Sequence, residues 1–239
     1  MKRVNLTIDG KGITALEGER LLWVVLDNGI YIPNLCAIQN DSELAGCRLC
    51  FVEVAGKEQP VTACTEPVTA GMVVSTRGEK AWRLARSAFE LLMASHPVEC
   101  AHCASNGMCE LQKIARHLGV SLKTKRFRKL TRELPVDESH PLFIYEPNKC
   151  VLCGRCVWAC REKLGIGVLG FAYRGFQRVV TTFASDPLGK SRCQECGECV
   201  RVCPVGALVF NNGGTTGVGS ATSVALARSG SNRATGVYQ

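Results

Sequence analysis

The sequence predicts a modular α+β protein organised around cysteine-rich loops. Three patterns support this: apolar and polar residues alternate at the N-terminus as in a β-strand, residues 78–95 repeat apolar side chains at the helical period, and one cysteine unit occurs twice in the second half. The chain has 15 cysteines in 239 residues, no pattern of a secretory signal peptide, and no apolar run near the roughly 18 residues of a membrane span. We therefore expect a cytoplasmic protein without a membrane span, whose cysteines bind metal rather than form disulfides.

Residues 1–77 are expected to form a small β-rich domain. The first residues alternate, and Asp9-Gly10 is a strong signal for a hairpin turn. An apolar helical stripe over 21–26 then ends at Asn28-Gly29, a typical helix stop, and a strand-like run covers 51–55.

Four cysteines of this domain follow the pattern C-x10-C-x2-C-x13-C. The spacing suits four thiolates around a 2Fe-2S cluster, three on one long loop and the last on a separate segment. The expected ligands are Cys36, Cys47, Cys50 and Cys64. For this segment alone, a zinc site or scattered core cysteines remain as alternatives. The first loop is longer than in the plant-type C-x4-C-x2-C pattern, so its shape and its effect on potential stay open.

Residues 78–139 are expected to form a second, helical domain. Its first helix carries an apolar face and should end where Pro97 disfavours helical geometry at the preceding residue. The histidine released there begins the pattern H-x3-C-x2-C-x5-C, a mixed set of four ligands: His96, Cys100, Cys103 and Cys109. Alternatively, His96 simply settles at the helix C-terminus. Ligation is favoured because every other group of four in the chain is complete; His102 and His117 are weaker candidates.

Residues 140–210 contain the unit C-x2-C-G-x-C-V-x-x-C twice, 43 residues apart. Each copy has the spacing that holds a 4Fe-4S cluster, and its fourth cysteine should serve the other cluster because it lies on the following helical turn. We assign one cluster to Cys150, Cys153, Cys156 and Cys203, and the second to Cys160, Cys193, Cys196 and Cys199. Gly154 and Gly197 should adopt positive φ in these loops. Pro204 follows the second copy, whereas Arg161 stands at the matching place in the first and should weaken the turn there.

The formal charge of +8 is explained by these cofactors better than by nucleic acid. Ionised ligands would bring about seven negative charges with the four clusters, which nearly offsets the basic excess. A basic run at 123–132 surrounds Phe127, and we interpret it as a solvated face or a contact to an acidic partner rather than a nucleic-acid site.

Two further segments need an interpretation. Residues 165–170 match G-x-G-x-x-G, but they follow a ligand-bearing helix and leave no room for a βαβ unit, so dinucleotide binding is rejected. Residues 168–183 instead predict a hairpin inserted between the two cysteine units. Residues 211–239 form a low-complexity tail rich in Gly, Ser, Thr and Ala, and we hypothesise that a partner surface holds it.

In this motif order, the chain resembles the diaphorase small iron-sulfur subunit of soluble NAD-reducing (Hox-type) NiFe hydrogenases. It is also similar to the N-terminal region of the complex I large iron-sulfur subunit and to the accessory region of FeFe hydrogenases. The resemblance covers residues 1 to about 210 and implies three modules: a β-grasp 2Fe-2S ferredoxin domain, a small His/Cys3 4Fe-4S domain and a two-cluster 4Fe-4S ferredoxin-like domain. It also implies hetero-oligomeric partners: a flavoprotein diaphorase subunit carrying FMN and NAD, and a NiFe hydrogenase small subunit.

We therefore expect an electron relay within an oxidoreductase complex, with no substrate-converting site on this chain itself. An equivalent subunit of a complex I-like NADH dehydrogenase, an NAD-dependent formate dehydrogenase or a multimeric FeFe hydrogenase is the alternative. A self-contained catalytic oxidoreductase and a zinc-stabilised nucleic-acid module are less favoured, because the four ligand groups use all 15 cysteines. The imidazole ligand should raise the reduction potential of the His96 cluster. This would place the cluster beside the main electron-transfer path rather than on it.

Overall fold

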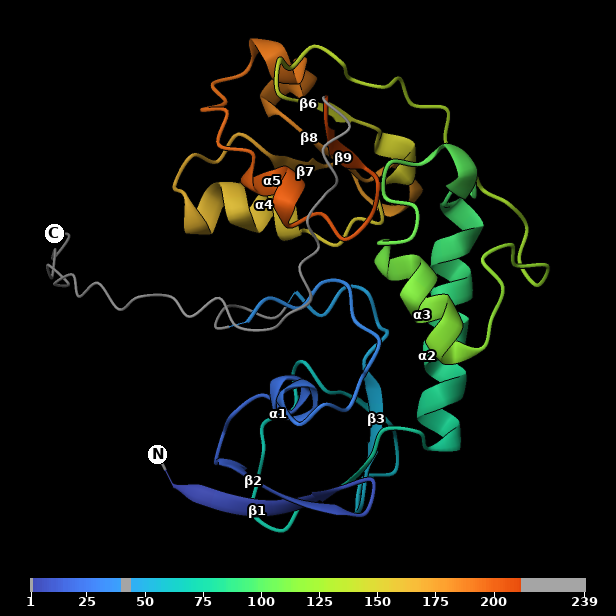
Figure 1. The fold of residues 1–239 in the computed structure, drawn as a ribbon, viewed down its shortest axis with the longest axis vertical. Helices are drawn as coiled ribbons and strands as arrows, with labels where there is room; N and C mark the ends of the chain where they lie inside the picture. Colours follow the sequence, from blue (N-terminus) through green and yellow to red (C-terminus); the bar gives the residue numbers. More distant parts are fainter. Residues whose placement is uncertain (1, 40–43, 212–239) are drawn as a thin grey trace, which may run out of the picture.

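The computed structural model describes residues 2–39 and 44–211 and confirms the α+β class. Figure 1 shows three parts: a sheet with a short helix at one end, two helices along one side, and a compact part with short strands at the other end. The predicted tail falls almost wholly at 212–239, outside the described residues. Within the described residues, no helix has the length and apolar character needed to cross a membrane.

The N-terminal part is a five-stranded sheet in the order β2-β1-β5-β3-β4, with β1 and β5 parallel and the other pairs antiparallel. The predicted hairpin is confirmed, because Asp9 and Gly10 have φ of 49° and 81° and join β1 to β2. The predicted helix is confirmed as well, since α1 ends just before Asn28 and Gly29 has φ of 74°. The elements are β1 (Arg3–Ile8), β2 (Lys11–Leu16), α1 (Leu21–Asp27), β3 (Phe51–Val54), β4 (Val61–Thr62) and β5 (Val73–Ser75).

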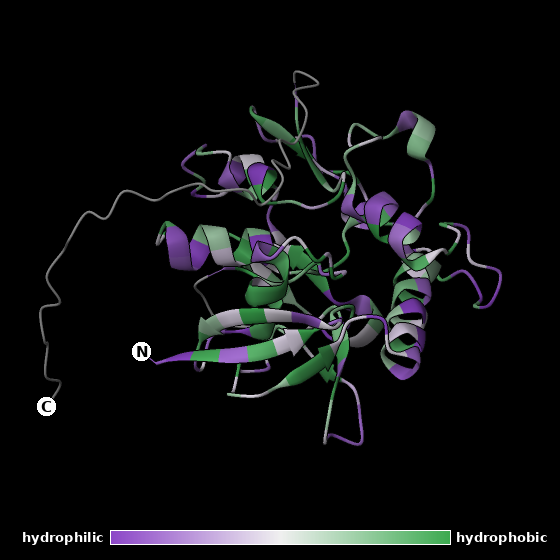
Figure 2. Ribbon diagram, turned by 60° about the horizontal axis from the view of Figure 1, so that its bottom comes forward, coloured by the Kyte–Doolittle hydropathy of each residue, from purple (hydrophilic) through white to green (hydrophobic). Residues whose placement is uncertain are grey.

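The middle part consists of α2 (Glu79–Ser95) and α3 (Glu110–Leu118), with a 3₁₀ turn at Cys100–His102 between them. Helix α2 buries Ala85 and Phe89 and leaves its charged residues outside, as the amphipathic pattern predicts; Figure 2 shows the polar colour on the outer face of these helices. At its end, His96 is extended with φ of −98° and ψ of 128°, as expected before Pro97.

The C-terminal part pairs β6 (Phe143–Tyr145) with β9 (Leu208–Phe210). Two four-residue helices follow the two cysteine loops: α4 (Arg155–Trp158) and α5 (Glu198–Arg201). The predicted insert is confirmed as a hairpin, in which β7 (Gly170–Ala172) pairs antiparallel with β8 (Val179–Thr181). The remaining short helical turns are Pro147–Lys149, Ala159–Lys163, Gly175–Gln177, Phe183–Ser185 and Leu188–Lys190.

The apolar core forms two clusters whose boundary does not follow the order of the chain. One lies between α1 and the five-stranded sheet. The other joins α2 and α3 to the C-terminal part, and it also includes Leu35 and Leu49 from the loop that carries the first cysteines. The first cysteine loop is therefore packed against the C-terminal part, so the three parts form one body.

Candidate iron-sulfur sites

The first cysteine group gathers where the N-terminal sheet meets the rest of the molecule. Cys36 and Cys47 lie on the loop after α1, with sulfurs 3.4 Å apart, and the Cys47 N–H points at the Cys36 sulfur over 3.5 Å. Cys50 directly precedes β3, and Cys64 follows β4 and interacts with Cys50. The structure thus brings the four predicted ligands together in two adjacent pairs.

The electrostatics of this group suit a shared anionic cofactor. The Cys36 pKa is lowered to about 6, chiefly by the hydrogen bond with Cys47. The same contact and burial raise the pKa of Cys47, and contact with Cys64 and burial raise that of Cys50. These neighbouring thiols cannot all ionise without a counter-charge. The iron ions of a cluster supply that charge and favour the thiolate form.

The second group lies between α2 and α3. Cys100 begins the 3₁₀ turn, Cys103 directly follows it, and Cys109 precedes the first residue of α3. Burial raises the Cys109 pKa, the N–H groups of the next helical turn oppose this, and the charges of Cys103 and Cys100 raise it further. The three thiols are therefore close enough to interact.

His96 has the environment of an imidazole with one free ring nitrogen. Its Nδ1 is buried and has no hydrogen-bond partner within the described part of the chain. Burial first, and then the charges of Lys129 and Lys149, lower the imidazole pKa to about 4, while a hydrogen bond to the Lys149 backbone raises it. A neutral ring that donates one N–H to a carbonyl and leaves the other nitrogen open is typical of a metal-ligating histidine.

The two other histidines of this part lie in different surroundings. His102 is exposed beside Cys103. His117 on α3 packs against the rings of Tyr31 and Trp82, at centroid distances of 4.8 and 5.1 Å, so its side chain serves packing.

The remaining eight cysteines line two cavities, four in each. Each cavity has three thiols from one copy of the cysteine unit and the last thiol of the other copy. The first cavity is lined by thiols of copy one and by the last cysteine of copy two: Cys150, Cys153, Cys156 and Cys203. The second cavity is lined by the complementary set: Cys160, Cys193, Cys196 and Cys199. Apolar side chains make up most of the remaining walls, so each cavity offers four sulfurs in a water-poor enclosure.

These cavities differ from a site for one small ion. Zinc requires its sulfur ligands at about 2.3 Å from a single point. Within residues 2–39 and 44–211, no set of three or more His, Cys, Asp or Glu side chains converges on one such point. Four thiols around a cavity fit the larger cubane cluster, whose ligands bind separate iron atoms.

Comparisons with known proteins agree with these three parts. Residues 1–79 match a family model for a 2Fe-2S iron-sulfur cluster binding domain. Residues 86–123 match the NADH-ubiquinone oxidoreductase-G iron-sulfur binding region, and residues 140–209 match the ferredoxin-like domain of NADH-quinone oxidoreductase subunit 3. The predicted boundaries of 1–77, 78–139 and 140–210 lie near these matches and stay predictions.

A chain in the crystal structure of an NAD+-reducing [NiFe]-hydrogenase in the H2-reduced state has the same fold, with a TM-score of 0.79 and 31% sequence identity. The match covers 92% of this chain and 91% of that chain. The chain belongs to this family of iron-sulfur electron-transfer subunits. The family expectation from the sequence is thereby confirmed, as is the arrangement of a 2Fe-2S ferredoxin, a 4Fe-4S region and a ferredoxin-like domain.

Other relatives are longer oxidoreductase subunits, and this chain matches only a part of each. The chain is 35% identical to NADPH-Fe(3+) oxidoreductase subunit alpha of Geobacter sulfurreducens, over 86% of this chain and 24% of that protein. It is 36% identical to the NADP-reducing hydrogenase subunit HndD of Solidesulfovibrio fructosivorans, over 87% of this chain and 36% of that protein. The chain therefore spans about a quarter to a third of the length of these curated relatives.

In this chain, the G-x-G-x-x-G segment makes contacts that the sequence motif did not reveal. Gly165 and Gly167 both have φ of 68°, and the N–H groups of Ile166 and Gly167 donate to the carbonyl of Cys160. The next N–H, from Val168, lies 3.3 Å from the Cys160 sulfur. The glycines wrap the backbone around a thiol, and N–H donors to ligand sulfur are a recognised means of tuning cluster potential.

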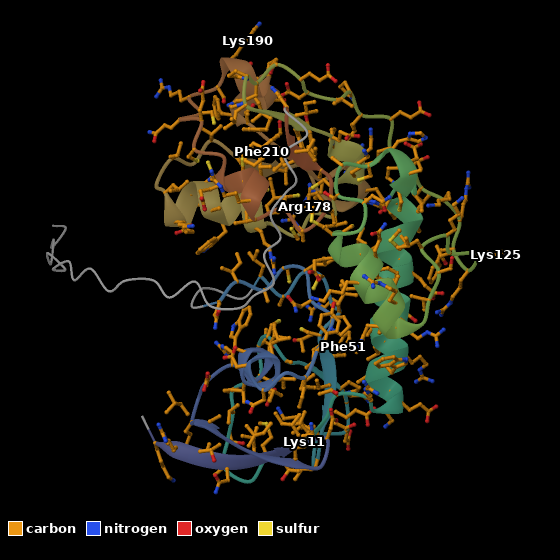
Figure 3. The ribbon with its side chains drawn as sticks, in the orientation of Figure 1. Lys11, Phe51, Lys125, Arg178, Lys190 and Phe210 are labelled. Carbon is orange, nitrogen blue, oxygen red and sulfur yellow. The ribbon has the colours of Figure 1, made fainter. Side chains whose placement is uncertain are left out.

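The basic side chains of the run at 123–132 are exposed, as predicted for a solvated face, except for the half-buried Arg132. Three of its side chains bind within the chain. Arg126 pairs with Glu90, Lys129 donates to the carbonyls of Met93 and His96 at the end of α2, and Arg132 donates to the carbonyls of Arg178 and Pro147. Arg126 and Lys129 remain exposed despite these bonds, and Figure 3 shows Lys125 at the outer edge of this loop. Lysine at a helix C-terminus satisfies carbonyls that have no partner in the helix.

Two other groups near the thiols carry no signal in the sequence. Tyr145 is buried against Cys150 and donates its hydroxyl proton to the Val180 carbonyl, which ties the inserted hairpin to β6. Arg155 reaches from α4 to the first cysteine loop, where its Nη2 donates to the Ala37 carbonyl over 3.0 Å. Neither residue type carries a spacing signal, since both contacts depend on how the parts pack.

Proposed function

We propose that this chain relays single electrons between an FMN- and NAD-binding diaphorase subunit and a NiFe hydrogenase module in the cytoplasm. In this proposal, one 2Fe-2S cluster is held by Cys36, Cys47, Cys50 and Cys64, and one 4Fe-4S cluster by His96, Cys100, Cys103 and Cys109. Two further 4Fe-4S clusters are held by the crossed sets, Cys150, Cys153, Cys156 and Cys203, and Cys160, Cys193, Cys196 and Cys199. Bound clusters of these types supply one-electron steps, which link a hydride-transferring flavin to a one-electron metal site.

The observation that carries the proposal is the sharing of one apolar core by groups from different parts. Leu35 and Leu49 of the first loop, Leu111 and Ile114 of α3, and Val200 of α5 all belong to the same buried cluster. The chain therefore keeps water out from between the ligand groups and fixes their spacing. A relay needs these two properties, because electron transfer depends on short, constant gaps.

The residues of the chain also set the charge and polarity at each site. Backbone N–H groups face several thiols: that of Leu152 lies 3.4 Å from the Cys150 sulfur, and those of Val205 and Leu208 lower the Cys203 pKa against the effect of burial, the largest cause. Such donors stabilise extra negative charge on a reduced cluster. The chain thus holds its ligands and tunes potential, and substrate conversion is assigned to the partners.

The test is metal and sulfide analysis of anaerobically purified protein. The proposal predicts about 14 iron atoms and about 14 acid-labile sulfides per chain, from one 2Fe-2S and three 4Fe-4S clusters. About four zinc atoms with no acid-labile sulfide would contradict it. A redox titration monitored by EPR would also examine whether the His96 cluster has a raised potential.

A second host assembly is favoured by the relatives themselves. An NADH-quinone oxidoreductase chain of Rhizobium meliloti is 34% identical over 86% of this chain and 24% of that protein. An equivalent relay in a complex I-like NADH dehydrogenase is therefore the alternative. Purifying the native complex and identifying its subunits decides the case: a NiFe hydrogenase subunit supports the first proposal, and quinone-reducing subunits support the second.

A further inference from the structure

Arg155 lies between two of the candidate sites and contacts both parts that carry them. It is the first residue of α4, directly after Gly154 and between Cys153 and Cys156. Its side chain leaves this part of the fold and donates from Nη2 to the carbonyl of Ala37, 118 residues away and next to Cys36. One guanidinium thus joins the loop that carries Cys36 to the loop that carries Cys153 and Cys156.

The contact lies within a packed interface. A Cβ added at Gly154 would lie 2.8 Å from Leu44 Cδ1, so the first cysteine loop comes directly against the backbone beside Arg155. Leu35 and Leu49 of the same loop are 1% and 0% exposed and share a core with Cys156. The Arg155 side chain is therefore half-buried where the two loops meet.

The guanidinium still has a donor to spare. Arg155 Nε is buried and lacks a hydrogen-bond partner within the described residues. A buried N–H of an arginine is costly to leave unpaired, which favours an acceptor at this position in the loaded protein. Anionic sulfur on either side is such an acceptor, because both neighbouring groups consist of thiolates once a cluster is bound.

The charge of Arg155 lies close to both groups. Its guanidinium donates to the carbonyl of Ala37, the residue after Cys36, and its own backbone lies between Cys153 and Cys156. One fixed positive charge therefore favours negative charge on both sides of the interface.

We propose that Arg155 is a positioning residue shared by the 2Fe-2S site and the Cys150/Cys153/Cys156/Cys203 site, and that its charge raises the reduction potentials of both together. This inference rests on the proposed function. Each site gains one negative charge on reduction, and a nearby cation stabilises the reduced form, more strongly in a water-poor interface. Arginine is suited to this role because it does not lose its proton in proteins. Shifting both potentials in the same direction keeps the two sites matched, so that an electron is not trapped on one of them.

The test compares Arg155→Met and Arg155→Gln, which remove the charge, with Arg155→Lys, which keeps it. Full-length protein is titrated potentiometrically and followed by EPR, which separates the 2Fe-2S signal from the 4Fe-4S signals. Removing the charge should shift the 2Fe-2S potential and one 4Fe-4S potential to more negative values and leave the other two unchanged. Arg155→Lys should restore both potentials most of the way. Arg83→Met, at an exposed arginine on α2, is the matched control and should shift none.

The outcomes separate a charge effect from a structural one. If the two potentials stay at their wild-type values in Arg155→Met and Arg155→Gln, or if all four shift alike, the inference is overturned. It is also overturned if Arg155→Lys behaves like Arg155→Met, because loop geometry rather than charge would then be responsible. Iron and sulfide analysis accompanies each titration; if Arg155→Met loses a cluster, the Lys and Gln variants decide. Wild-type protein without clusters would refute the proposed function instead.

Discussion

The two copies of the cysteine unit have the same backbone and different surroundings. In both, the glycine after the second cysteine is left-handed, with φ of 81° at Gly154 and 71° at Gly197. The residue before that cysteine is left-handed as well, with φ of 55° at both Leu152 and Glu195. Each loop then leads into a four-residue helix. The repeated sequence thus dictates a repeated cradle for three thiols.

The surroundings of the two cradles differ in access to water. In the first copy, Lys149 is buried and Val151 is half-buried. The loop that carries Cys36 and Cys47 packs against this copy at Gly154. In the second copy, Gln194 and Glu195 are exposed, and Leu164, which is 37% exposed, lines the cavity. Ligand spacing determines the type of cluster, whereas exposure and nearby charge set its potential. Two copies of one motif can therefore have different redox properties.

The largest expected effect comes from removing a thiol that belongs to one copy and lines the other cavity. Cys203→Ala should abolish the same 4Fe-4S signal as Cys153→Ala, and Cys160→Ala the same signal as Cys196→Ala, because the cavities cross the copies. EPR and iron content measure the loss, about four iron atoms per variant. If Cys203→Ala matched Cys196→Ala, the crossed assignment would be wrong.

A smaller effect is expected from alanine at the two left-handed glycines. Gly154→Ala and Gly197→Ala should each cost about 1–2 kcal/mol, because L-residues are strained at these angles. For Gly197 the new Cβ would lie 3.1 Å from the Phe210 ring, whereas for Gly154 it meets the movable end of Leu44. Thermal unfolding should show a Tm lowered by about 2–8 °C in these variants, with the greater loss for Gly197→Ala. Gly12→Ala, in open space on β2, is the control, and an equal loss there would contradict the explanation.

Asparagine at Asp137 should loosen only the cavity lined by Cys160, Cys193, Cys196 and Cys199. The Asp137 carboxylate accepts hydrogen bonds from the N–H groups of Leu188, over 2.8 Å, and Ser139, and Leu188 lines the cavity of the second copy. We expect Asp137→Asn to cost about 1 kcal/mol, since hydrogen bonds to a charged acceptor are the stronger ones. The loss of 4Fe-4S signals to a chelator should then accelerate for one signal. Asp186→Asn, at an exposed carboxylate, should leave the rate unchanged.

The smallest effect concerns the ion pair that joins the two copies. Lys163, in the helical turn after the first copy, lies 2.7 Å from Glu198 on α5, and Arg201 also pairs with Glu198. A double-mutant cycle with Lys163→Met and Glu198→Gln should give a coupling of about 0.5 kcal/mol, because the pair is partly exposed. High salt should weaken it. A coupling that salt leaves unchanged would indicate a packing contact instead.

The elements with strong local signals were predictable from the sequence. Asp9-Gly10, the stop at Asn28-Gly29 and the break at Pro97 each act through the backbone angles of one or two residues, and all three were confirmed. The glycines of the two cysteine loops follow the same logic. The pairing of the eight C-terminal thiols across two cavities also agrees with the spacing rule, although the ligand set itself stays a prediction.

Contacts between parts were beyond sequence reasoning because they depend on packing across long separations. Arg155 meets Ala37 across 118 residues, and Lys129 caps α2 from a loop that composition alone placed in solvent. The weakened turn expected at Arg161 agrees with the structure, although the path that follows it was not predicted. Without a proline there, the chain continues through a π-helical turn at Ala159–Lys163 and then folds its glycines over the thiol of Cys160.

Gly206 shows how tightly the parts interlock: a Cβ at this position would lie 2.5 Å from the sulfur of Cys103. At this position no methyl group fits beside the Cys103 thiol, so a side chain at residue 206 would displace a candidate ligand of the middle part. Exchanging one part for that of a distant relative would place mismatched faces against each other. The similarities to NADPH-Fe(3+) oxidoreductase, hydrogenase and NADH-quinone oxidoreductase subunits each extend over 86% or more of this chain, so each covers all three parts together.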